Sequence, residues 1–154
     1  MINGWLIYMI IAFIVAVLAV PLKYWRGLIN AGITGMAGAL LIDGTLLSLQ
    51  AFQFVHTGLR IFGLPVPYWI SYFFGGIIFA HHRPFGKWSR FIYVLGFAVF
   101  LWLLEYIMIL LGFFQHLRWT LFKSMVLNIL GFTLVLAIIE WLQPTYRVNR
   151  TRQA

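Results

Sequence analysis

Residues 91–113 read FIYVLGFAVFLWLLEYIMILLGF, an apolar run that contains one charged side chain, Glu105. A helix of about 20 apolar residues is long enough to cross the roughly 30 Å hydrocarbon core of a bilayer. A run of this length and hydrophobicity is typical of a transmembrane helix rather than of a helix in a water-soluble protein. This stretch therefore predicts that the chain is embedded in a membrane.

Similar apolar runs occupy most of the remaining chain. We expect membrane-spanning helices near residues 4–22, 28–48, 65–80, 91–113 and 120–142. The run at 65–80 is the shortest, so four spans remain an alternative to five. The sequence thus predicts an all-α fold, a polytopic transmembrane helical bundle in which residues 1–154 form a single domain.

The composition excludes several other classes of protein. Hydrophobic residues make up 63% of the chain and charged residues 9%, against roughly a quarter charged in soluble domains. The net charge of +8 arises from short clusters between the apolar runs, so we expect anionic lipid headgroups at the basic cytoplasmic loops as partners and no nucleic acid. A membrane protein partner and a homo-oligomer both stay open. The chain has no Cys, which excludes disulfides, a thiol nucleophile and cysteine metal sites. No cofactor or metal is expected.

The distribution of basic residues predicts the orientation. Short cytoplasmic loops are enriched in Lys and Arg. Eight of the eleven basic residues follow the first, third or fifth predicted span, namely Lys23, Arg26, Arg83, Lys87, Arg90, Arg147, Arg150 and Arg152. The other three are Arg60, Arg118 and Lys123. We therefore expect a multi-pass protein of the bacterial plasma membrane, with its N-terminus outside and a basic tail, 143–154, in the cytoplasm.

The segment 50–62 shows two interleaved sets of residues at helical spacing. The apolar set is Phe52, Val55, Leu59 and Phe62, and the polar set is Gln50, Gln53, Thr57 and Arg60. This pattern predicts an amphipathic helix lying along the outer interface. An extension of the preceding span beyond the membrane is the alternative.

All three acidic residues fall within predicted spans, where a carboxylate is costly and usually has a function or a partner. Glu140 lies at the cytoplasmic end of its span, and we expect it to pair with the basic tail near Arg147. Asp43 and Glu105 both lie about 21–23 Å from the cytoplasmic ends of their helices. Polar residues at similar depth predict a cluster in the outer half of the membrane, consisting of Asp43, Glu105, Asn128, Lys123, Ser71 and Tyr72.

The orientation of Asp43 follows from its own helix. Ala31, Gly35, Ala39 and Asp43 recur every four residues and share one face. Small residues allow close approach of membrane helices, so this face should point into the bundle and carry Asp43 with it. Two roles stay open for the buried acids: a structural pair with Lys123 or Arg118, or a site for a cation, a proton or a polar ligand.

The stretch Leu41-Ile42-Asp43 after a helix of small residues, Glu105 in mid-span and Arg118-Trp119 before the last span resemble an uncharacterised family of small multi-span membrane proteins from Gram-positive bacteria. The resemblance implies a small integral membrane protein and assigns no catalytic residue.

The chain lacks His-Glu-x-x-His, Gly-x-Ser-x-Gly and phosphate-binding glycine motifs. We therefore expect a non-enzymatic binding, transport or accessory component. One alternative is a transporter or channel for a cation, proton or small solute that uses Asp43 and Glu105. The other is a lipid-modifying membrane enzyme, in which His81 or His82 would take part.

Overall fold

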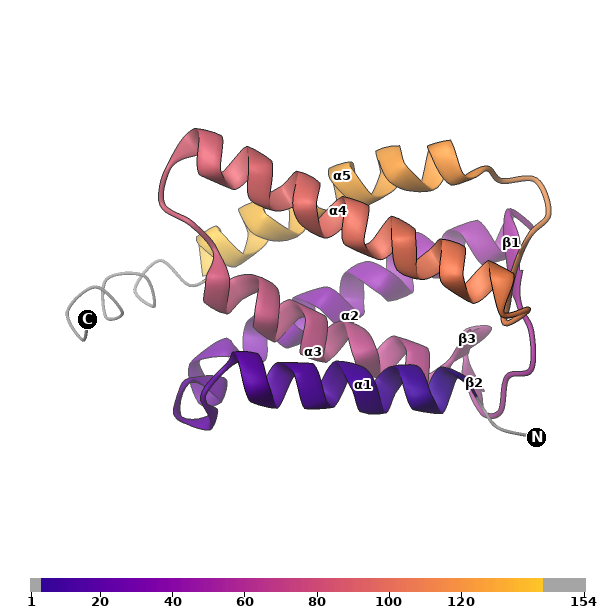
Figure 1. Ribbon diagram of the computed structural model, residues 1–154, viewed down its shortest axis with the longest axis horizontal. Coiled ribbons are helices and arrows are strands. Elements are labelled where there is room, and N and C mark those ends of the chain that lie inside the picture. The colour runs from indigo at the N-terminus through magenta and orange to yellow at the C-terminus, as the bar shows by residue number, and fades with distance from the viewer. Residues whose placement is uncertain (1–3, 143–154) are drawn as a thin grey trace.

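The computed structural model describes residues 4–142 of the chain, and most of these residues are helical (Figure 1). The described part contains five α-helices, one in each predicted apolar run: α1 (Gly4–Ala19), α2 (Trp25–Ser48), α3 (Val66–His82), α4 (Lys87–Leu110) and α5 (Leu121–Leu142). A single 3-10 turn, η1 (Leu22–Tyr24), joins α1 to α2. The expectation of an all-α bundle is confirmed.

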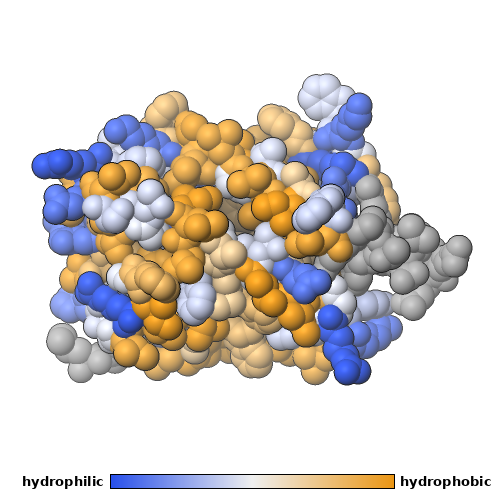
Figure 2. All heavy atoms as spheres, turned by 180° about the vertical axis from the view of Figure 1, so that it is seen from behind, coloured by the Kyte–Doolittle hydropathy of each residue, from blue (hydrophilic) through white to orange (hydrophobic). Residues whose placement is uncertain are grey.

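Three of the helical segments are long and apolar enough to cross a membrane: Leu22–Ser48, Lys87–Leu110 and Leu121–Leu142. α1 is apolar but shorter, with 16 residues, and α3 has 17. Figure 2 shows hydrophobic side chains across the middle of the molecule, with hydrophilic side chains gathered towards both ends. This distribution is the one expected for a protein whose middle contacts lipid.

The helices form two groups that run side by side (Figure 1). α3 packs against both α1 and α2, α4 packs against α5, and α5 also contacts α2. The connections 20–24 and 83–86 lie at one end of the bundle, which we call the turn end. The connections 49–65 and 111–120 lie at the opposite end with the short strands, and we call it the strand end.

Small residues bring α2 and α3 into close contact, as the four-residue spacing predicts. A Cβ atom at Gly35 would lie 2.5 Å from the backbone oxygen of Tyr72, and one at Gly76 would collide with the backbone oxygen of Ala31. Ala31 and Ala39 are buried. The face of α2 that carries Asp43 therefore packs on α3.

At the strand end, α2 and α4 terminate in the same way. Gln50 and Gly112 adopt positive φ angles of 54° and 74°. The next residues donate hydrogen bonds back to the helix, Ala51 N to Leu46 O at 3.0 Å and Phe113 N to Met108 O at 2.9 Å. This is the Schellman pattern, which ends a helix and turns the chain away from its axis.

The two caps lead directly into two strands that pair with each other. β1 (Phe52–Phe54) lies antiparallel to β4 (Phe114–His116), with Gln53 opposite Gln115. A second pair, β2 (Arg60–Ile61) and β3 (Leu64–Pro65), forms a tight hairpin. Phe62 and Gly63, at its tip, both have positive φ angles, as a two-residue type I′ turn requires.

The predicted amphipathic helix at 50–62 is therefore wrong. Gln50 ends α2, and the following backbone groups pair with β4 and within the hairpin. The apolar residues of the helical pattern also separate: Phe52 is buried, whereas Leu59 and Phe62 are 75% and 78% exposed. The helical spacing was a poor guide because the pairing partner of β1 lies more than fifty residues away in the chain.

Candidate functional site: a polar cavity at the strand end

A cavity of about 60 Å³ lies at the strand end and is lined by residues from all five helices. Its polar lining consists of Asp43, Glu105, Ser124 and Asn128. Its aromatic walls are Trp5, Tyr8, Phe52, Tyr68, Tyr72, Phe114 and Trp119. Leu and Met side chains complete the surface, so charged groups face a mainly hydrophobic space.

Asp43 is held by tyrosines of the neighbouring helix. The hydroxyl of Tyr68, in the first turn of α3, donates a 2.8 Å hydrogen bond to Oδ2 of Asp43. The hydroxyl of Tyr72 lies one turn further along and is hydrogen-bonded to that of Tyr68 at 2.8 Å. The close packing of α2 on α3 brings these three side chains together.

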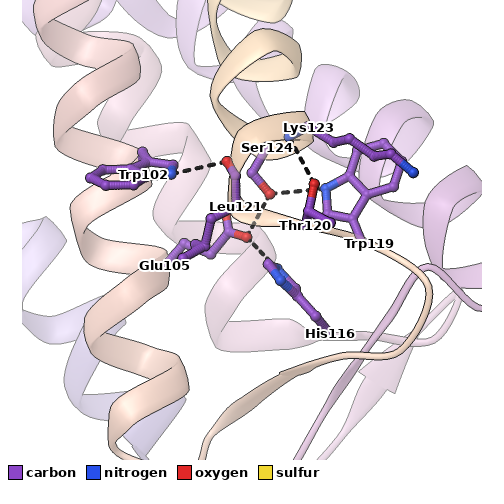
Figure 3. A network of polar contacts seen from close by, with 8 residues as sticks. All are labelled: Trp102, Glu105, His116, Trp119, Thr120, Leu121, Lys123 and Ser124. Carbon is purple, nitrogen blue, oxygen red and sulfur yellow. Dashed lines mark hydrogen bonds and ion pairs between the residues drawn. The ribbon is translucent and has the colours of Figure 1, made fainter.

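Glu105 is held from the other side of the cavity, in the network of Figure 3. Its Oε1 atom lies 2.6 Å from Nε2 of His116 and accepts a 2.6 Å hydrogen bond from the hydroxyl of Ser124. The indole of Trp119 donates in turn to Ser124 at 2.9 Å. Donors from β4 and from the first turn of α5 thus converge on one carboxyl oxygen, which fixes Glu105 against the strand end.

Asp43 is hydrogen-bonded to both tyrosines, Tyr68 and Tyr72. Glu105 uses a single carboxyl oxygen in its contacts, and within residues 4–142 its Oε2 atom accepts no hydrogen bond. The carboxamide of Asn128 also makes no hydrogen bond to the described residues. The cavity wall therefore retains unused hydrogen-bonding capacity on two side chains, Glu105 and Asn128.

The charges around the cavity are unbalanced. The ion pairs among residues 4–142 join Arg90 to Glu140 and His116 to Glu105. Neither pair includes Asp43. A carboxyl group away from water is stable when it is protonated or when it meets a positive charge, and the described part of the chain supplies no such charge to Asp43.

Four of the six residues of the predicted polar cluster line the cavity: Asp43, Glu105, Asn128 and Tyr72. Two do not. The hydroxyl of Ser71 is turned back to Pro67 O of its own helix, and the ammonium of Lys123 lies 5.5 Å from the ring centroid of Trp119. The alternative in which the acids form ion pairs with Lys123 or Arg118 is not observed. Glu105 contacts His116 and Ser124 instead.

Sequence reasoning missed four residues that shape the site: Tyr68, His116, Trp119 and Ser124. A signal existed for two of them. Tyr68 precedes Tyr72 by one helical turn and so shares its face. His116 belongs to Phe114-Gln115-His116, which repeats the alternation of Phe52-Gln53-Phe54, and such alternation favours strands.

The remaining ionisable candidates lie at the turn end. Glu140 contacts Arg90 at 3.2 Å, and its predicted neighbour Arg147 lies outside the described residues, as does the basic tail. His81 is buried and packs on the ring of Tyr24, with His82 beside it. The two histidines are at the opposite end of the bundle from the cavity.

Comparison with known protein families, with curated proteins and with solved structures finds no match for this chain.

Proposed function

We propose that this chain is a five-span integral membrane protein that acts as a non-enzymatic binding or transport component, with its cavity open to cationic or polar ligands from the outer side. The observation that carries the proposal is Asp43, a carboxyl group that faces a cavity and has no cationic partner among the described residues. A positively charged ligand would supply the missing compensation.

Five spans are supported by the way the short helices pack. α1 and α3 have lengths of about 24 and 26 Å at 1.5 Å per residue, slightly less than the hydrocarbon thickness. α3 packs on α2, which is long enough to cross, and α1 packs on α3. Short helices packed side by side with a longer span cross with it, because local thinning of the bilayer costs only a fraction of a kcal/mol per Å of mismatch.

Charge supports placing the strand end outside. Lys23, Arg26, Arg83, Lys87 and Arg90 are all at the turn end, whereas the strand end has Arg60, Arg118 and Lys123. The positive-inside rule then assigns the turn end to the cytoplasm. Reporter fusions after Gly86 and after the C-terminus should both report a cytoplasmic location, and a fusion in the connection 111–120 should report an external one.

A binding role is favoured over an open pore by the packing of the turn-end half. Phe79 stacks on Tyr93 and contacts Phe97 and Phe132 with ring centroids 5.0 Å apart. Val20, Leu28, Ile77 and Ile139 are fully buried around them. In the described chain, the space below the cavity is therefore filled by hydrophobic side chains.

The absence of native cysteines permits a direct test of the cavity. Asn128→Cys should react with a small methanethiosulfonate reagent added from outside, and a cationic reagent should react about tenfold faster than an anionic one, because two carboxyl groups attract it. Adding Asp43→Asn should reduce this preference. Leu130→Cys, on the exposed face of the same helix, serves as the control and should be unreactive in lipid.

Equal rates for the two reagents at Asn128→Cys would contradict a cation-selective cavity. No reaction with either reagent, in a folded protein, would contradict access from outside.

A further inference from the structure

We propose that the ligand of this cavity is a primary ammonium group, an inference that rests on the proposed function and adds the chemical class of the ligand. A primary ammonium has three N–H donors. Oxygen acceptors for these donors line the cavity on three side chains, the carboxyl groups of Asp43 and Glu105 and the carboxamide of Asn128. Within residues 4–142, Oε2 of Glu105 and the carboxamide of Asn128 have no hydrogen bond.

The aromatic walls favour an organic cation. Trp5 and Tyr68 meet at 86° with ring centroids 5.3 Å apart, and Tyr68 and Tyr72 meet at 70° with centroids 5.1 Å apart. All three rings line the cavity, and the faces of Trp and Tyr attract cations within about 6 Å. Aromatic faces and carboxyl groups together stabilise an ammonium better than either does alone.

The donor set does not suit a divalent metal ion. Ca²⁺ takes six to eight oxygen ligands and Mg²⁺ requires a near-octahedral set. Among residues 4–142, no three His, Cys, Asp or Glu side chains are grouped so that they could hold a metal ion.

The size of the cavity limits the ligand. Its volume of about 60 Å³ accommodates roughly four water molecules, at about 15 Å³ for each. An ammonium group on a chain of one or two carbons has this size. Leu101, Leu104 and Met108 provide the apolar surface for the attached carbons.

Calorimetric titration of the full chain in dodecyl maltoside tests the inference, since this detergent carries no ammonium group. The probes are ethylammonium, tetramethylammonium and potassium as chloride salts. Ethylammonium should bind at least about tenfold tighter than either of the other two, because it alone combines positive charge with three donors and an alkyl group.

Two substitutions and one control separate the cavity from non-specific charge effects. Asp43→Asn should weaken ethylammonium binding about tenfold, and Asn128→Ala should weaken it several-fold. Glu140→Gln is the control. It removes a carboxylate charge at the turn end, where Glu140 contacts Arg90, and it should leave the affinity for ethylammonium unchanged. An equal loss in Glu140→Gln would overturn the assignment to the cavity.

Different results would refute the primary ammonium and the cation-binding cavity. Potassium or tetramethylammonium binding as tightly as ethylammonium, with sensitivity to Asp43→Asn, would refute the primary ammonium and leave a cation-binding cavity. The absence of binding by any of the three probes, together with equal thiol-reagent rates at Asn128→Cys, would refute both.

The ammonium group belongs either to a soluble amine or to a lipid headgroup, and a second titration in nanodiscs distinguishes these sources. If the headgroup of phosphatidylethanolamine occupies the cavity, adding this lipid to phosphatidylcholine discs should raise the apparent Kd of ethylammonium by competition. An unchanged Kd identifies a soluble amine as the ligand.

Discussion

The two halves of α3 pack in opposite ways. In its turn-end half, Gly76 lies directly against the backbone of α2, and Phe79 is surrounded by rings of α4 and α5. In its strand-end half, Tyr68 and Tyr72 face a cavity that contains two carboxyl groups. α3 stays in close contact with α2 as far as Tyr72, whose backbone oxygen faces Gly35, but the side chains that it directs at the other helices are apolar in one half and polar in the other. The same helix thus provides both a rigid joint and a wall of the candidate site.

Disrupting the joint should have the largest effect. Gly76→Ala places a methyl group against the backbone oxygen of Ala31, which cannot move aside without separating α2 from α3. We expect a loss of about 3 kcal/mol in the free energy of unfolding, at the upper end of overpacking costs. The measurement is unfolding by SDS in mixed dodecyl maltoside micelles.

Gly75→Ala is the matched control for this prediction, because a Cβ atom at Gly75 has no neighbour within 4 Å. It should be neutral or stabilise the helix by up to about 1 kcal/mol. Similar losses in both variants would mean that α2 and α3 do not approach closely at Gly76.

The next largest effect concerns the cavity wall at Glu105. Glu105→Gln removes the charge that strengthens the hydrogen bonds from His116 and Ser124. The expected cost is about 2 kcal/mol, within the range for hydrogen bonds to charged groups. Equilibrium unfolding measures it, and hydrogen exchange of the backbone at β4 should increase in the same variant. Unchanged exchange at β4 would contradict the anchoring of this strand by Glu105.

A smaller effect on stability is expected for Asp43→Asn, the corresponding change of a carboxyl group to an amide on the opposite side of the cavity. Asp43→Asn retains an acceptor for the Tyr68 hydroxyl, and the described residues offer Asp43 no ion pair. We expect stability to change by less than about 1 kcal/mol, although ligand binding is weakened. A loss of about 3–5 kcal/mol would instead indicate that Asp43 takes part in a buried ion pair. Asp43 would then be a structural residue, as Glu105 is.

The smallest effect should come from the outer face of α5. Leu130 is 61% exposed in the bundle, and lipid tails are as apolar as its side chain, so exposure costs nothing in a bilayer. Leu130→Ala should change the free energy of unfolding by less than about 0.5 kcal/mol, whereas Ile139→Ala, at a fully buried position of the same helix, should lose about 2 kcal/mol or more. Equal losses would mean that Leu130 contacts another protein surface.

The positions of the helices were predictable because an apolar run of this length has few alternatives. All five predicted runs contain a helix, and the helix ends differ from the predicted bounds by at most four residues. The inward orientation of Asp43 was also predictable, since four-residue spacing on a single helix is a local property.

The sequence by itself determined the helices, the polar residues that they carry and the face of α2 that packs on α3, because these depend on hydrophobicity and spacing along one chain segment. Only the tertiary structure decided the strands and the partners of the acids. β1 pairs with a strand that lies beyond two intervening helices, and His116 reaches Glu105 through that pairing. Contacts of this kind depend on where separate helices end relative to one another, and a local pattern contains no information about that distance.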